Sequence, residues 1–158
     1  MSLHKNPQAK GAFIGINSSH TAGDLGKAIV EGVAYYLKNA MDVFRQAGND
    51  PEGLTLIGGA LKSSLWRKVL CDVIGLPCAI PKDSEQAISI AAAITGGVGI
   101  GMFDGFDVCN EFISLEETLA PDFKKHRMYE KLNALGEKAY CALENINAEI
   151  SDVLRSGI

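Results

Sequence analysis

A strand, a glycine pair and a helix follow one another near the middle of the chain, and this succession constrains the fold more than any other feature. The short run at 54–57 predicts a buried strand. Gly58 and Gly59 then allow a tight turn and let a ligand approach the backbone without obstruction by a Cβ atom. A helix capped by Ser63 or Ser64 follows. A helix N-terminus in this setting offers free amide groups to an anion, and the anion we expect is a phosphate.

Two well-known phosphate-binding motifs do not match this segment. A Walker A loop requires a glycine directly before Lys-Ser, whereas Leu61 precedes Lys62 and Ser63 here. A dinucleotide fingerprint requires a third glycine at the start of the helix and an acidic residue about twenty positions later, and the sequence meets neither requirement cleanly. From spacing alone, the glycine pair is equally compatible with the plain end of a strand in an α/β domain.

The composition narrows the class of protein. A chain of 158 residues is long enough for one domain with a sizeable core. Its net charge of −4, without a run of basic residues, argues against nucleic acid or an anionic membrane surface as partner. No apolar stretch of membrane length and no signal peptide is recognisable, so we expect a cytoplasmic protein.

The four cysteines and three histidines do not form a ligand pattern. The histidines are dispersed, and the cysteines share no close pair spacing. We therefore expect structural thiols in a reducing compartment, rather than zinc ligands or disulfides. The cysteines are Cys71, Cys78, Cys109 and Cys141.

Helices and strands are predicted to alternate along the chain, which indicates an α/β unit with a parallel sheet. Apart from the central strand and its helix, which should stop at Gly75, the apolar periodicity predicts four elements. They are an extended segment at 12–16, an amphipathic helix at 25–44 opened by a Thr21/Asp24 capping pair, a strand at 76–80, and a close-packed, buried helix starting at Asp83 or Ser84. Glycines from 96 to 101 should end that helix, and residues 104–124 should be irregular.

From about His126 to the end, the sequence predicts one long helix with a narrow apolar seam. We expect the seam to pack on the body of the domain, with a coiled-coil dimer as the alternative. The seam consists of Tyr129, Leu132, Gly136, Ala139, Leu143, Ile146, Ile150 and Val153.

The first three residues, Met-Ser-Leu, resemble a start derived from an expression vector. The sequence after them resembles the interior of a domain. A sheet of only two or three strands also leaves unpaired edges. Both features lead us to expect that strands of the same domain precede residue 1 in a longer protein.

Several segments resemble, in the right order, the C-terminal half of the second domain of the FGGY family of carbohydrate kinases, and the xylulokinases among them most closely. The segments are Gly-Ala-Phe-Ile-Gly at 11–15, Ser19-His20-Thr21, Lys-Ala-Ile-Val-Glu-Gly-Val at 27–33, Gly-Gly-Ala-Leu-Lys-Ser at 58–63, Leu-Trp-Arg-Lys-Val-Leu-Cys-Asp-Val-Ile-Gly-Leu-Pro at 65–77, Ala91-Ala92, Pro121 and Tyr129. The resemblance covers nearly the whole chain.

This resemblance implies part of an actin-like ATPase domain, of the ribonuclease H-like type, with a small parallel sheet, flanking helices and a long C-terminal helix. Residues 1–10 would be the start or linker, 11–124 the nucleotide-binding subdomain, and 125–158 the long helix. In such kinases two domains close on ATP, and Mg²⁺ is carried by the nucleotide.

The resemblance also implies the site. Gly58, Gly59 and Ala60 would lie along the phosphates, and Ser63 and Trp66 would sit beside the nucleoside. The family often has a third glycine where this chain has Ala60, and Gly-Ala-Ala where this chain has Ala-Ala-Ala at 91–93.

Other residues receive weaker assignments. Lys62 would add positive charge, the 19–21 segment would lie near the cleft or simply cap a helix, and Glu31 would be structural. No catalytic residue is assigned, because the carboxylate base of such kinases belongs to their first domain, so we expect this chain alone to be inactive.

The expected activity of the parent protein is phosphoryl transfer from ATP to a ketopentose such as xylulose. Gluconate, glycerol or another polyol is the alternative substrate. An alternative function of a different class is that of a non-catalytic binding or assembly module, whose C-terminal helix recruits a partner. We also expect a homo-oligomer, because an exposed sheet edge and the apolar seam both favour association.

Overall fold

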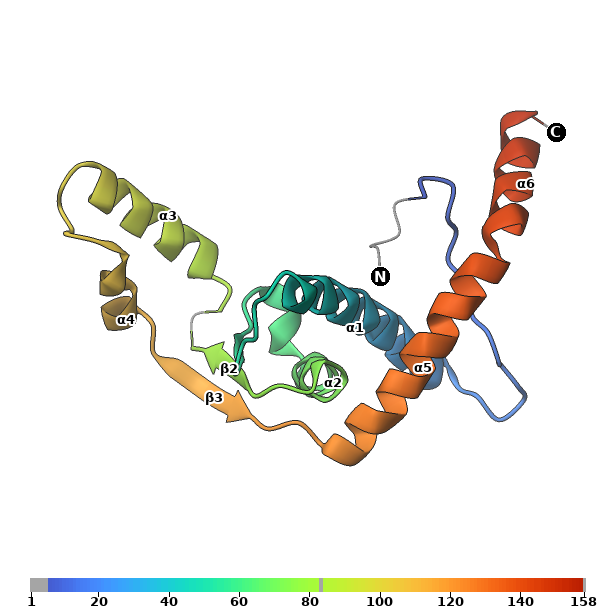
Figure 1. The fold of residues 1–158 in the computed structure, drawn as a ribbon, viewed down its shortest axis with the longest axis horizontal. Coiled ribbons are helices and arrows are strands. Elements are labelled where there is room, and N and C mark those ends of the chain that lie inside the picture. Colours follow the sequence, from blue (N-terminus) through green and yellow to red (C-terminus); the bar gives the residue numbers. More distant parts are fainter. Residues whose placement is uncertain (1–5, 83, 158) are drawn as a thin grey trace.

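The computed structural model describes residues 6–82 and 84–157 (Figure 1). Residues 1–5 of the predicted start, and Asp83, lie outside the described residues. The elements are α1 (Ala22–Gln46), β1 (Leu54–Thr55), the 3₁₀ turn η1 (Gly59–Lys62), α2 (Ser64–Ile74), β2 (Cys78–Pro81), α3 (Ala87–Gly99), the 3₁₀ turn η2 (Phe106–Val108), α4 (Cys109–Phe112), β3 (Leu115–Leu119), α5 (Phe123–Ala142) and α6 (Glu144–Arg155).

The predicted capping pair opens α1. The Thr21 hydroxyl accepts a hydrogen bond from the Asp24 backbone N–H, and the Asp24 carboxylate accepts one from the Thr21 N–H at 2.8 Å. This reciprocal arrangement satisfies two amide groups that the first helical turn leaves unpaired. The helix is longer than the predicted 25–44, and the predicted extended segment at 12–16 is exposed and forms no strand.

The sheet has the strand order β1-β2-β3 and is mixed. β1 pairs with β2 in parallel, as expected, with Leu54 opposite Cys78. β3 pairs with β2 in the antiparallel sense, with Leu119 opposite the same cysteine. The prediction of an irregular segment at 104–124 is therefore wrong, as is that of an all-parallel sheet. The alternation in Leu-Glu-Glu-Thr-Leu is weak, and the pairing with β2 decides the conformation.

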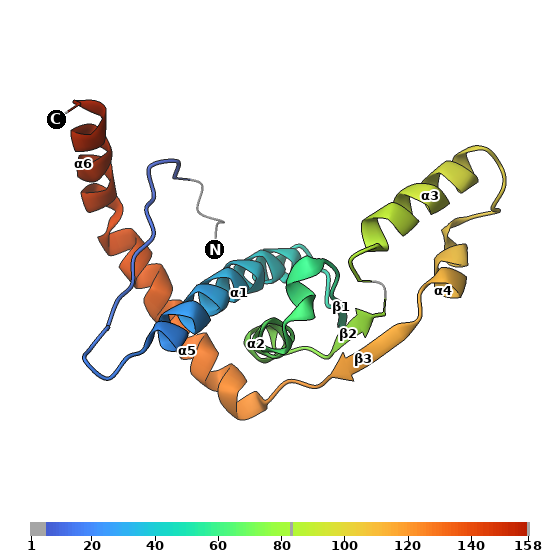
Figure 2. The same ribbon diagram turned by 180° about the vertical axis from the view of Figure 1, so that it is seen from behind.

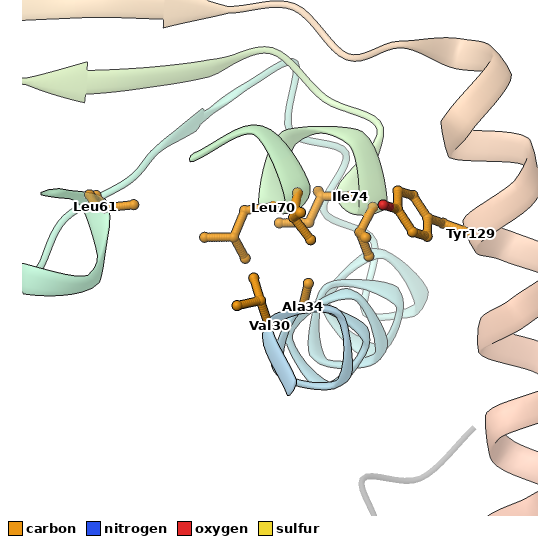
Figure 3. Packing of buried hydrophobic residues seen from close by; sticks show 8 residues of the cluster. Val30, Ala34, Leu61, Leu70, Ile74 and Tyr129 are labelled. Carbon is orange, nitrogen blue, oxygen red and sulfur yellow. The ribbon is translucent and has the colours of Figure 1, made fainter. Parts of the chain in front are cut away.

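The hydrophobic core lies where α1, α2 and the first turns of α5 meet (Figure 3). Val30 and Ala34 from α1 face α2, whose last two turns are almost entirely buried. The core residues are Val30, Ala34, Leu61, Val69, Leu70, Val73, Ile74 and Tyr129. α2 then ends at Gly75, in the left-handed conformation with φ +77°, as the sequence predicted.

The helix α3 corrects a prediction. Of its residues only Ile94 and Gly97 are buried, although its sequence is apolar on nearly every side. It begins at Ala87, later than predicted, and it continues through the glycines to Gly99. Figures 1 and 2 show α3 and α4 at one end of the molecule, away from α1 and α5. The apolar composition of a helix indicates that its surface is suited to burial, but it does not identify the partner that buries it.

The C-terminal region is two helices, because α5 ends at Ala142 and α6 begins at Glu144. The seam does not pack inward as expected, since Ile146 and Val153 are 49% and 58% exposed. Apart from Tyr129, the buried residues of these two helices are the polar Asn133, Asn147 and Ser151.

Hydrogen bonds explain that polar burial. The Asn133 side-chain amide donates to Asn39 Oδ1 at 2.7 Å, which joins α5 to α1. Lys10 Nζ donates to Ser151 Oγ at 2.7 Å, and the N-terminal segment runs alongside α5 and α6 in both views (Figures 1 and 2). The side of the helix pair that meets the rest of the chain is thus partly polar, and much of the apolar seam faces outward.

Candidate phosphate-binding turn

The glycine turn joins β1 to α2. Leu56 still donates its backbone N–H to Ala79 O at 2.9 Å, so the chain follows the sheet one residue beyond β1. Gly58 then adopts φ +112° and ψ 164°, a conformation that L-residues rarely occupy. The turn into η1 therefore depends on glycine at this position.

The first amide of the turn is already paired. Gly58 donates its N–H to the backbone oxygen of Ser84 at 3.0 Å. The sequence predicts free amide groups at this turn and places Gly58 along the phosphates, but the Gly58 amide is not free. This bond attaches the start of the turn to the segment that leads into α3.

The next two amides remain available. Gly59 and Ala60 are exposed, and neither N–H donates to another residue within the described ranges. In a 3₁₀ turn the first intrahelical donor is the third residue, here Leu61, which donates to Gly58 O at 3.2 Å. A Cβ added at Gly59 would meet no atom within 4 Å. Two exposed residues before α2 thus have N–H groups without an acceptor among the described residues, which suits a phosphate oxygen.

Ser63 and Trp66 lie on the first turn of α2. Ser63 is the N-cap residue, but its hydroxyl makes no capping hydrogen bond and the residue is exposed. Trp66 is partly buried and packs against the core cluster. Residues three apart share a helix face, so these two side chains border the same side of the turn.

The charged residues around the turn are held by partners. Lys62 Nζ lies 2.9 Å from Glu85 Oε1, in an ion pair whose side chains are both largely exposed. The Arg67 guanidinium contacts Leu61 O and two glutamates of β3, Glu116 and Glu117. The contacts of Arg67 with β3 and of Ser84 with Gly58 were not predicted from the sequence. The partners lie far apart along the chain, and no local pattern indicates that they meet.

Glu31, predicted to be structural, joins α1 to α5. Its carboxylate accepts a hydrogen bond from the Tyr129 hydroxyl at 2.9 Å and pairs with Lys27 Nζ at 2.9 Å. Burial, followed by this hydrogen bond, raises the pKa of Tyr129. Both contacts fit a role in joining the helices.

Two cysteines are structural thiols, as predicted. Cys71 and Cys78 are both fully buried, and both lie 3.4 Å from the carbonyl oxygen of Leu76. Cys109 is only half-buried, however, and Cys141 is exposed.

Metal and membrane features are absent from the part of the chain that the structure describes. No group of three or more histidine, cysteine, aspartate or glutamate residues there could hold a metal ion. Nor is any helix within the described ranges both long and apolar enough to cross a membrane.

The fold is shared with solved kinase structures. The crystal structure of xylulose kinase from Rhodospirillum rubrum matches 90% of this chain with a TM-score of 0.73 at 27% sequence identity, and the match covers 29% of that kinase. These kinases have an actin-like ATPase fold, so the mixed sheet and its helices form part of such a domain.

Sequence comparison identifies the family. Residues 1–100 match the profile of the C-terminal domain of the FGGY family of carbohydrate kinases. The chain therefore belongs to this family. Xylulose kinase from Staphylococcus epidermidis is 32% identical over 148 residues, which are 93% of this chain and 30% of that protein. Glycerol kinase from Myxococcus xanthus is 31% identical over 122 residues, which are 77% of this chain and 24% of that protein. The chain thus spans less than a third of the length of either relative.

Proposed function

We propose that this chain forms the nucleotide-binding wall of an ATP-dependent carbohydrate kinase, with the Gly59 and Ala60 amides as donors to the phosphates. One observation carries the proposal: in a chain of this family, both N–H groups are exposed and without an acceptor among the described residues. Backbone donors at the approach to a helix N-terminus suit an anion, because the helix dipole adds to their charge.

The remaining residues of the turn would shape the site. Gly58 brings the chain into the turn, and Gly59 leaves room for a phosphate beside its backbone. The Ser63 hydroxyl, which makes no capping hydrogen bond, would be available to the nucleoside. Trp66 would contact the nucleoside with the edge of its ring. ATP would supply the phosphoryl group, and Mg²⁺ would be held by its phosphates, since the described residues include no cluster of metal ligands.

Phosphoryl transfer needs charge stabilisation on all sides of the transferring group and a base for the attacking hydroxyl. The Gly59 and Ala60 amides would supply one side only. We therefore expect this chain alone not to phosphorylate any sugar. The activity belongs, in this proposal, to a longer polypeptide that includes the chain.

The proposed substrate is a ketopentose such as xylulose. The relative from Staphylococcus epidermidis, named a xylulose kinase, supports this choice because it matches 93% of the chain. Glycerol is the alternative, supported by the glycerol kinase relative at nearly the same identity, and gluconate or another polyol stays open.

The test uses a kinase polypeptide that carries this chain, assayed with xylulose, ribulose, gluconate and glycerol. Gly59→Val should raise the KM for ATP about tenfold, because the added side chain would obstruct the approach of the phosphate to the backbone and so weaken about one charge-assisted hydrogen bond. The KM for the sugar should hardly change. Gly105→Val is the matched control, because Gly105 has extended backbone and equally open space but lies outside the turn. An equal rise in both KM values for Gly59→Val would contradict the proposal.

A further inference from the structure

The guanidinium of Arg67 lies at the C-terminal end of the glycine turn. Its Nε donates to the backbone oxygen of Leu61, the third residue of η1. Its Nη1 lies 3.3 Å from Glu116 Oε1 and 3.1 Å from Glu117 Oε2, and its Nη2 lies 3.4 Å from Glu116 Oε2. The side chain is only 17% exposed. The hydrogen bonds to Glu116 and then Glu117 raise the pKa of Arg67.

Leu61 is consequently held both by its side chain and by its backbone carbonyl. Its side chain is 2% exposed and belongs to the core cluster (Figure 3). Its carbonyl is held by Arg67, which is itself attached to β3. At the other end of the turn, the Gly58 N–H is held by Ser84 O at 3.0 Å. The Gly59 and Ala60 amides lie between these two anchored points.

We infer that Arg67 is a positioning residue for nucleotide binding: it orients the Gly59 and Ala60 amides through Leu61 and does not touch the phosphates. This inference rests on the proposed function. A guanidinium has a planar, fixed set of donors. In Arg67 each of its three nitrogens already points at a protein acceptor, and the flanking carboxylates compensate its charge.

The neighbouring residue provides a matched control. Lys68 also ties α2 to a distant segment, since its Nζ lies 3.0 Å from Asp72 Oδ1 and 3.3 Å from Ala120 O. Within the described part of the chain, the Lys68 side chain forms no hydrogen bond or ion pair with η1. Lys68→Ala removes a cation and a long-range attachment from the same helix, but it leaves the attachment of Leu61 in place.

The experiment compares wild type, Arg67→Ala, Arg67→Lys and Lys68→Ala in the chain itself. Amide hydrogen exchange is measured at Leu61, whose N–H is paired with Gly58 O at 3.2 Å, and the Kd for ATP is measured by titration. Arg67→Ala should speed exchange in the turn and weaken ATP binding roughly tenfold, as expected for the loss of one well-placed hydrogen bond to a phosphate. Arg67→Lys should show a smaller effect in the same direction, because an ammonium cannot serve both the carbonyl and the carboxylates. Lys68→Ala should leave both quantities as in wild type.

Three results would overturn the inference. Unchanged exchange at Leu61 in Arg67→Ala would show that Arg67 does not order the turn. Arg67→Lys with full wild-type behaviour would show that charge alone matters. Equal effects of Lys68→Ala and Arg67→Ala would indicate general destabilisation. Absence of ATP binding by the wild type would instead refute the proposed function, and with it the nucleotide part of the inference, while exchange would still decide whether Arg67 orders the turn.

Discussion

The carboxylate of Asp72 accepts a hydrogen bond from the backbone N–H of Asp122 at 2.8 Å, across fifty positions of sequence. Asp72 is 2% exposed and also lies 3.0 Å from Lys68 Nζ. Asp122 in turn caps α5, because its own carboxylate accepts from the Lys124 and Lys125 N–H groups. One buried residue of α2 thus holds the residue that caps α5.

Removal of the Asp72 carboxylate should lower the stability of the fold. Asp72→Ala leaves the Asp122 amide and the Lys68 ammonium without their partner, and we expect a loss of about 3 kcal/mol in the free energy of unfolding. Urea denaturation followed by circular dichroism measures it. Asp152→Ala is the control, since the Asp152–Arg155 pair is exposed on both sides and should contribute less than about 1 kcal/mol. Similar losses for the two variants would contradict the role given to Asp72.

A second prediction concerns the end of α2. Gly75 has φ +77°, and a Cβ there would lie 2.6 Å from His126 Nε2. Gly75→Ala should therefore cost both backbone strain and a clash, together about 2–4 kcal/mol. Gly48→Ala isolates the strain, because Gly48 has φ +90° but nothing within 4 Å of the added atom. Thermal unfolding of both variants tests this, and the clash would be refuted if Gly48→Ala were equally destabilising.

The parts of the fold that were predictable depend on local signals. The capping pair Thr21/Asp24 and the C-terminal Gly75 each act within one helical turn, so the sequence alone locates these ends of α1 and α2. The Gly58-Gly59 turn was also recognisable, because a glycine pair after a strand leaves few conformations open.

The parts that were missed depend on distant partners. β3 is a strand because it pairs with β2, about 40 residues earlier in the chain. In the turn, the Gly58 amide is occupied by Ser84 and the Leu61 carbonyl by Arg67, and neither bond has a sequence signature. The exposure of Ile146 and Val153 in the seam was not predicted, because apolar periodicity does not identify which side of a helix meets the rest of the chain.

A third prediction concerns alkaline pH. Burial raises the pKa of Tyr35 and of Tyr129 above the ordinary value of 10.0, and the two rings pack edge to face. Because the folded pKa exceeds the unfolded one, this contribution to stability is complete below about pH 10 and is lost as the pH rises further. Tyr35→Phe should flatten the decline of stability above about pH 10, measured by urea unfolding. Tyr36→Phe, at a 56% exposed position, should leave the decline unchanged, and the same flattening there would contradict the assignment.

A fourth prediction concerns association. Ile146, Ile150 and Val153 lie on the outward side of α6 with 41–58% exposure, so water contacts much of this apolar surface. We expect a homo-oligomer, in the simplest case a two-fold dimer. Light scattering during size exclusion should show it, and Ile150→Glu should shift the chain toward monomer. Wild type that elutes as a monomer at low micromolar concentration would contradict the prediction.

The most direct test of the nucleotide-binding proposal is an amide NMR titration of this 16.8 kDa chain with ATP. We predict that the Gly59 and Ala60 resonances shift and saturate, with a Kd on the order of a millimolar or tighter. The Gly105 resonance should remain in place, and in Gly59→Val the shifts at the turn should require about tenfold more ATP. No change at Gly59 and Ala60 under saturating ATP, or shifts confined to residues outside the turn, would contradict it.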